Sequence, residues 1–172
     1  MKKTITVKQA VELFNFLSSL DKKRDDVGNV VAADKNRITD RQVRAAVIDN
    51  IIALLPVKNA FAQKYKELQK QYFTDSYTRL LRSRAEIEQT NDNVALANIN
   101  KAIKEEESTF AEEYNASFKK IMKEEVEVNL VEIDRDRFDE ATEGDCGLPL
   151  KVYIDFNFIF SNNRTEDGNE KD

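Results

Sequence analysis

The stretch TDRQVRAAVIDNIIALLPV, residues 39–57, is the strongest helical segment of the sequence, and the other elements are predicted outward from it. Thr39 and Gln42 have the spacing of a capping box, in which the hydroxyl accepts from a backbone N–H of the first turn. Pro56 has no backbone donor, so we expect the helix to kink or restart there. Apolar residues between these points recur at helical steps. The buried stripe should comprise Val43, Val47, Ile51 and Leu54. It should be widened on one side by Ile48, Ile52 and Leu55.

The residues before this segment predict a strand followed by a helix. Residues 3–7 (KTITV) alternate and are rich in Thr, Ile and Val, as is typical of a short strand. Thr6 and Gln9 have the spacing of a second capping box, which opens a helix over 7–20. Apolar residues at three- and four-residue steps give this helix one apolar face.

Helical periodicity continues beyond Pro56 on both sides of one clear turn. It predicts a helical segment over 39–88, kinked or broken near Pro56, and a second helix over 94–124. Thr90–Asn93 is the turn between them. Because this turn is short, the second helix should return antiparallel against residues 57–88, so that the two form a long helical hairpin. Its inward-facing aromatic column should comprise Phe61, Tyr65, Tyr72, Phe110, Tyr114 and Phe118.

Strand alternation replaces helical periodicity near the C-terminus. Residues 125–133 and 148–160 predict two strands, and the second is strongly apolar on one face. Such a strand has to be covered by the helices or by another subunit. Residues 161–172 carry no apolar anchor and are expected to form a disordered tail. We interpret the second strand as a self-association strand, with the apolar residues Val152, Ile154, Phe156, Phe158 and Phe160.

The scarcity of turn-forming residues supports a mainly helical protein. The 172 residues include four Gly and two Pro, whereas the two together usually make up about 12% of a chain. That scarcity disfavours turn-rich sandwiches, barrels and propellers. The predicted class is α+β and mainly α, in a single domain over 1–160. We expect a helical hairpin and an N-terminal helix, with a small antiparallel sheet formed mostly by the C-terminal strands.

The residue types that the chain lacks argue against an enzyme. There is no His, and Cys146 is the only cysteine. Without His, the usual Ser–His, Cys–His and His–metal arrangements cannot be assembled from this chain. We therefore predict no catalytic residue, no metal site and no cofactor. A single cysteine forms no internal disulfide, and apolar runs such as Val47–Val57 are too short to cross a bilayer. We expect a cytoplasmic protein without a membrane partner.

Two acidic clusters are the remaining candidates for metal or hydrolytic chemistry. The spacing over Asp134–Glu140 is partly that of a calcium loop, but Asp139 and Asp145 stand where such a loop needs Gly and Glu. Asp155 and Lys151 share one face of the predicted strand, although alternation alone explains polar residues there. We prefer a solvated turn and a solvent-facing strand to a metal-dependent hydrolase.

Arginine-rich helix faces point to a different kind of partner, an anion. Arginines on one face of a helix can grip phosphates, and a nearby tyrosine can stack on a base. The same residues could instead be solvated faces paired with acids. The candidates for binding an anionic partner, a nucleotide or a nucleic acid are Arg37, Arg41, Arg44, Tyr77, Arg79, Arg82 and Arg84.

The net charge of −5 is the sum of two halves of opposite sign. Residues 1–84 carry 17 basic and 9 acidic side chains, a net of +8, and residues 85–172 carry 10 and 23, a net of −13. Such halves can neutralise one another across a hairpin or between subunits. The sequence therefore favours a non-enzymatic protein that acts by protein–protein interaction, as a homo-oligomer or with another protein.

The order of these features, rather than any one motif, resembles a known group. It runs from a short ITV strand (5–7) through a helix ending LFNFLSSL (13–20) and a charged helical hairpin to EEVEVNLVEID (124–134). This order resembles the small uncharacterised proteins carried by bacteriophages and prophages. The resemblance covers most of 1–160 and implies a phage-encoded accessory protein that binds a host or phage protein in the host cytoplasm. The alternative is a counter-defence protein that sequesters a host signalling nucleotide.

Overall fold

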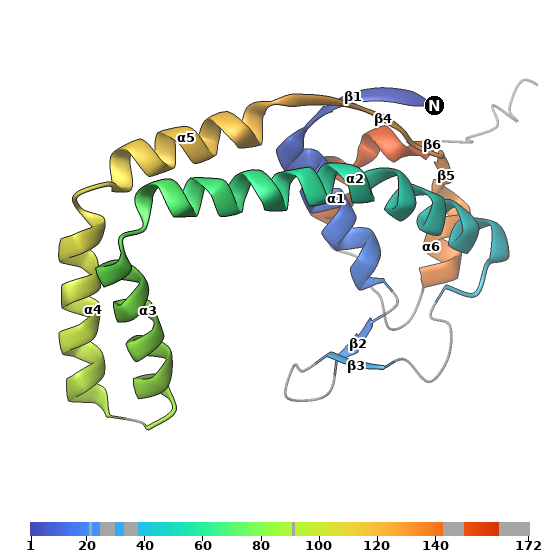
Figure 1. The fold of residues 1–172 in the computed structure, drawn as a ribbon. Helices are drawn as coiled ribbons and strands as arrows, with labels where there is room; N and C mark the ends of the chain where they lie inside the picture. The colour runs from blue at the N-terminus through green and yellow to red at the C-terminus, as the bar shows by residue number, and fades with distance from the viewer. Residues whose placement is uncertain (21, 25–29, 33–37, 91, 143–149, 162–172) are drawn as a thin grey trace, which may run out of the picture. The chain divides into compact units, whose positions relative to one another are not determined.

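The fold of the chain is taken from a computed structural model, which describes residues 1–20, 22–24, 30–32, 38–90, 92–142 and 150–161. The architecture is mainly helical with small sheets, which confirms the predicted α+β, mainly α class (Figure 1). Beyond Ser161, the tail expected over 161–172 lies outside the described residues, as does Cys146. In chain order the elements are β1 (Lys2–Thr6), α1 (Val7–Ser19), β2 (Lys22–Arg24), β3 (Val30–Ala32), α2 (Arg41–Tyr72), α3 (Asp75–Glu88), α4 (Asn93–Glu107), α5 (Ala111–Lys123), β4 (Glu125–Asn129), β5 (Ile133–Asp134), α6 (Arg135–Thr142), α7 (Leu150–Asp155), a 3₁₀ turn (Asn157–Ile159) and β6 (Phe160–Ser161).

The described residues form two compact units, where the sequence leads us to expect one domain over 1–160. The first unit takes its residues from Met1–Lys58 and Glu125–Asp172, and the second unit is Asn59–Glu124. The chain therefore enters the second unit within α2 and leaves it directly after α5.

Among its described residues, the first unit contains three short strand pairs, of which β1 with β4 joins the most distant parts of the sequence. β1 pairs antiparallel with β4, with Ile5 opposite Val126, and the two strands cover most of the strands predicted over 3–7 and 125–133. β2 pairs antiparallel with β3, and β5 pairs parallel with β6. At the end of β1, the capping box of Thr6 and Gln9 is present and begins α1.

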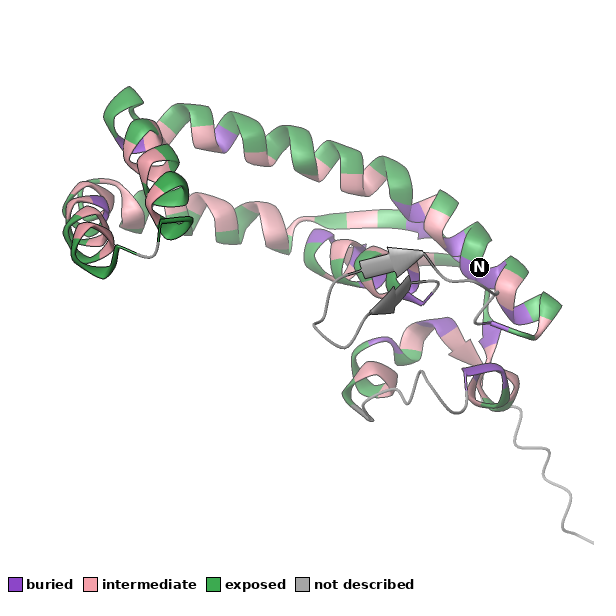
Figure 2. Cartoon of the chain, turned by 90° about the horizontal axis from the view of Figure 1, so that it is seen from below, coloured by how far each residue is buried: buried purple, intermediate pink, exposed green. Residues whose placement is uncertain are grey.

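The core of the first unit is built from α1, the first half of α2 and the C-terminal elements. Leu13 and Leu17 of α1 and Leu54 of α2 are at most 1% exposed, and they belong to one cluster with Phe138 and Ile159. Figure 2 shows buried residues along these elements, with exposed residues on the outer side of α2. Each such side chain stabilises the fold by about 1.5–3 kcal/mol through removal of apolar surface from water.

A buried amide ties α2 to the chain after β4. Asn50 is completely buried; its Nδ2 donates to the carbonyl of Val131 over 2.9 Å, and its Oδ1 accepts from the Val131 N–H over 2.7 Å. Both polar atoms of the side chain are therefore satisfied, as a buried amide requires. This pair joins residues that are 81 positions apart in the sequence.

The cap of α2 differs from the predicted capping box of Thr39 and Gln42. Asp40 takes the capping role, because its Oδ1 accepts from the N–H groups of Gln42 (2.7 Å) and Val43 (2.9 Å). Arg137 holds the other carboxylate oxygen of Asp40, with Nε at 3.1 Å and Nη2 at 2.6 Å. The backbone bond from Val43, followed by the Arg137 bond, lowers the pKa of Asp40. A carboxylate accepts these donors better than the neutral hydroxyl of Thr39 would.

The break that the sequence offered as one outcome at Pro56 is absent. α2 runs unbroken from Arg41 to Tyr72 with Pro56 inside it. Because Pro56 has no N–H, the carbonyl of Ile52 lacks its usual hydrogen bond within the helix. Both residues are exposed, so water can reach this carbonyl. The break comes instead at Thr74, whose hydroxyl accepts from the N–H of Tyr77 over 3.0 Å and begins α3.

The second unit is the predicted antiparallel hairpin, with a break in each of its arms. α3 packs against α4, and the end of α2 lies beside α5, joined by the side chains of Tyr72 and Ser117 (Figure 1). The helix predicted over 94–124 is therefore two helices. The turn between them is held by Ser108 and Thr109, whose hydroxyls donate to carbonyls of the preceding turn.

The predicted strand over 148–160 is wrong in the described part. Residues 150–155 form the helix α7, a 3₁₀ turn follows, and only Phe160–Ser161 is strand. A run of alternating apolar residues also contains pairs that are four apart, and such pairs share one face of a helix. Val152 and Phe156 are one such pair, since Phe156 belongs to the core and Val152 packs against it. Tyr153 fixes the helix from another side, because its hydroxyl donates to Asp139 of α6.

We predict that Asn50→Ala lowers the free energy of unfolding by about 2 kcal/mol, because the N–H and carbonyl of Val131 lose their partners. Urea denaturation followed by circular dichroism measures this change. Asp49→Ala, at the exposed neighbouring position, is the control and should stay within about 0.5 kcal/mol of wild type. Equal stability of the two variants would contradict a structural role for the amide pair.

Candidate functional site

Three large apolar side chains are exposed in a row on the outer side of α2. Ile48 is 47% exposed, Ile52 62% and Leu55 41%. Their spacing of four and three residues places them on one face of the helix. We call this face the α2 seam. A row of apolar side chains with this spacing is typical of a helix that packs against another helix.

The exposure of the α2 seam corrects the prediction that these residues widen the buried stripe. Val43, Val47 and Leu54 are buried as predicted, because α1 and the C-terminal elements of the first unit pack against their side of α2. None of the described elements of that unit covers the opposite side. The sequence does carry a signal for this outcome: the apolar residues between 43 and 55 span a wider arc than one partner surface can bury.

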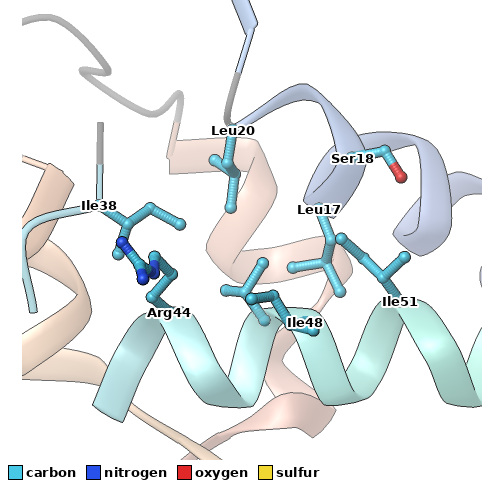
Figure 3. Close-up of a pocket in the computed structure, with 8 residues that line it drawn as sticks. Leu17, Ser18, Leu20, Ile38, Arg44, Ile48 and Ile51 are labelled. Atoms are coloured by element: carbon cyan, nitrogen blue, oxygen red, sulfur yellow. The ribbon is translucent and has the colours of Figure 1, made fainter. Parts of the chain in front are cut away.

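A hollow lies beside the α2 seam, between the end of α1 and the first half of α2 (Figure 3). Its volume is about 230 Å³. Ile48 belongs both to the seam and to the wall of the hollow, so the two features are continuous. The hollow is lined by Leu17, Ser18, Leu20, Ile38, Arg44, Val47, Ile48 and Ile51.

Arg44 is the charged residue among those that line the hollow. It is half-buried, and its guanidinium lies beside Ile38 at one end (Figure 3). Within the described part of the chain the Arg44 guanidinium forms no hydrogen bond or ion pair. A guanidinium in this position favours a carboxylate or phosphate, with which it can make two parallel hydrogen bonds.

The predicted anion-binding arginines are divided between the two units. Arg37 lies outside the described residues, and Arg41 is exposed at the start of α2. Arg79, Arg82 and Arg84 are exposed on α3 in the second unit. Arg84 pairs with Glu88 at 2.9 Å, and Arg79 donates to a carbonyl of its own helix. The two rows of arginines belong to different units, so they do not define a single site. Binding of a nucleotide or nucleic acid stays a prediction.

The prediction that Tyr77 stacks on a nucleic-acid base is wrong, because Tyr77 is a core residue of the second unit. It is 4% exposed, and its hydroxyl donates to Glu107 of α4. Its ring contacts Phe73 and Phe110, with centroid distances of 4.8 and 5.1 Å. Burial, and then the bond to Glu107, raise the pKa of Tyr77 above its usual value near 10. A base has no access to such a ring.

The predicted self-association residues divide into one exposed side chain and four that pack inward. Phe156 is buried, and Val152, Phe158 and Phe160 pack against the core of the first unit. Ile154 of α7 is 65% exposed. Of the predicted strand only Phe160–Ser161 is strand in the described part, and Ile154 is the one exposed side chain of the predicted surface.

Acids in both of the predicted clusters are engaged by neighbouring protein groups. Asp134–Glu140 spans the end of β5 and most of α6, where Asp134 accepts from the N–H of Arg137. Asp155 is ion-paired with Lys151 on α7, and this carboxylate raises the pKa of Lys151. Among the described residues there is no group of three Asp, Glu, His or Cys side chains that could hold a metal ion.

One described helix, α2, is long and apolar enough to cross a membrane by length and composition alone. Its buried face belongs to the core of the first unit, and Asn50 on it is bonded to the backbone of Val131. A core helix of a water-soluble protein meets the same criterion, so one such helix is weak evidence for a membrane span.

Comparison with known proteins gives no family or relative for this chain. No protein-family model matches it, and neither the curated proteins nor the solved structures contain a significant match. The function therefore has to be inferred from the α2 seam and the hollow.

We predict that Tyr77→Phe lowers the free energy of unfolding at pH 7 by about 1 kcal/mol, through loss of the bond to Glu107. The raised pKa of Tyr77 in the folded state stabilises the protein below pH 10, and this contribution is lost as the pH rises above 10. Urea midpoints measured from pH 8 to pH 11 should therefore fall less steeply in the variant. Identical slopes for both proteins would contradict the burial of this hydroxyl.

Proposed function

We propose that this chain is a non-enzymatic cytoplasmic protein that acts by protein–protein interaction through the α2 seam, and that it self-associates there. The observation that carries the proposal is the exposure of Ile48, Ile52 and Leu55 at helix-pairing spacing. These side chains are 41–62% exposed. Burying them against an apolar surface of a partner removes them from water and stabilises the complex.

A second copy is the partner that the proposal commits to. The same seam on two molecules is complementary to itself, because one row of apolar side chains can pack against an identical row related by a twofold axis. Such a contact closes on itself and gives a dimer rather than a fibre. A resemblance to phage accessory proteins agrees with action by binding, although the proposal does not depend on that origin.

We expect the wild-type protein to dimerise at micromolar concentrations and Ile52→Asp to weaken the dimer by at least roughly tenfold in Kd, since the charge would be buried at the centre of the contact. Sedimentation velocity over a dilution series measures both. Val94→Asp is the matched control, because Val94 is 74% exposed on α4 and lies outside the seam.

A wild-type protein that stays monomeric throughout the series would overturn the proposed self-association. An Ile52→Asp variant that dimerises as well as wild type would show that the seam is not the contact. Circular dichroism of each variant establishes that the helices are intact.

A further inference from the structure

The hollow beside the α2 seam has the size of a side-chain pocket. Its volume of about 230 Å³ lies below the roughly 300–1,000 Å³ of small-molecule sites. Its lining is aliphatic except for Ser18 and Arg44. Protein interfaces use pockets of this kind for one apolar anchor, surrounded by contacts that exclude water.

Arg44 supplies the pocket with an unmatched charge. Two other arginines of the first unit are engaged: Arg137 by Asp40 and Gln42, and Arg135 over the ring of Tyr153. Arg44 has no such contact with any residue that the structure describes, and it lines the pocket. The occupant that fits is therefore an apolar side chain with a carboxylate beside it.

The chain itself carries such a pair at Ile154 and Asp155. Ile154 is 65% exposed, and the Asp155 carboxylate next to it is paired with Lys151. This exposed ion pair contributes little to stability, so Asp155 can leave Lys151 for another cation. Val94 is comparably exposed, but its neighbouring carboxylate, Asp92, already caps α4. Ile154 was also among the residues that the sequence predicts for self-association.

We infer that the hollow receives Ile154 of a second copy, whose Asp155 faces Arg44. This inference rests on the proposed self-association and names a contact within it. When both copies exchange α7 in this way, two equivalent contacts form and the assembly closes as a dimer. Ile48 lines the pocket and belongs to the seam, so the anchor contact and the seam contact form one continuous surface.

A charge exchange tests the inference in the full-length protein. Arg44→Glu and Asp155→Lys, each alone, should weaken the dimer by roughly tenfold, because each places like charges together in a partly desolvated contact. The double variant restores the opposite pair and should return to within about threefold of the wild-type Kd. Ile154→Asp should weaken the dimer as well. Sedimentation velocity measures the four constants.

Arg41→Glu is the matched control, because Arg41 is an exposed arginine one turn earlier on α2 and does not line the hollow. Its Kd should equal that of wild type. A dimer that is broken by Ile52→Asp but unaffected by Arg44→Glu and Ile154→Asp overturns this inference and leaves the proposed function standing. A monomeric wild type overturns both. Failure of the double variant to recover, with its circular dichroism unchanged, also overturns the Arg44–Asp155 contact.

Discussion

The two faces of α2 are the constraint on which the first unit depends. One face supplies Val43, Val47 and Leu54 to the core, and Asn50 on the same helix is bonded to the backbone of Val131. These contacts fix the rotation of the helix about its own axis. With that rotation fixed, Ile48, Ile52 and Leu55 have to point outward. The exposed seam is thus a consequence of the core packing, since turning the helix to bury the seam would expose Leu54 and break the Asn50 pair.

The second unit is stabilised mainly by aromatic contacts rather than by a large aliphatic core. Phe61, Tyr65 and Phe118 contact one another near one end of the hairpin, with centroid distances from 5.8 to 6.3 Å. Phe73 and Tyr77 meet near the breaks in the two arms, with centroids 4.8 Å apart. Rings with edge-to-face geometry fill a gap between two helices and also fix their relative rotation. The packing of the second unit therefore depends on ring contacts between its helices.

Local patterns account for most of what the sequence could predict. The helical segments that contain α1–α5, the turn near Asp92 and the β1–β4 pair follow from periodicity, capping residues and strand alternation within short windows. The strand over 148–160 could not be distinguished from a helix, because its apolar residues satisfy both periods. Asp40 displaced Thr39 as the cap of α2 through its contact with Arg137, 97 residues away. The wide apolar arc of α2 indicates that some of its apolar residues stay exposed, but no local pattern says which side of the helix is covered.

The most direct measurement of the central claim is the solvent accessibility of isoleucine methyl groups in solution. A soluble paramagnetic agent broadens the NMR signals of methyl groups that it can approach. If the α2 seam is a self-association surface, broadening of the Ile48 and Ile52 methyl signals decreases as the protein concentration rises, while the signal of the control residue Val94 keeps its broadening. If the Ile48 and Ile52 signals are broadened equally at every concentration, the seam remains exposed and the account is contradicted.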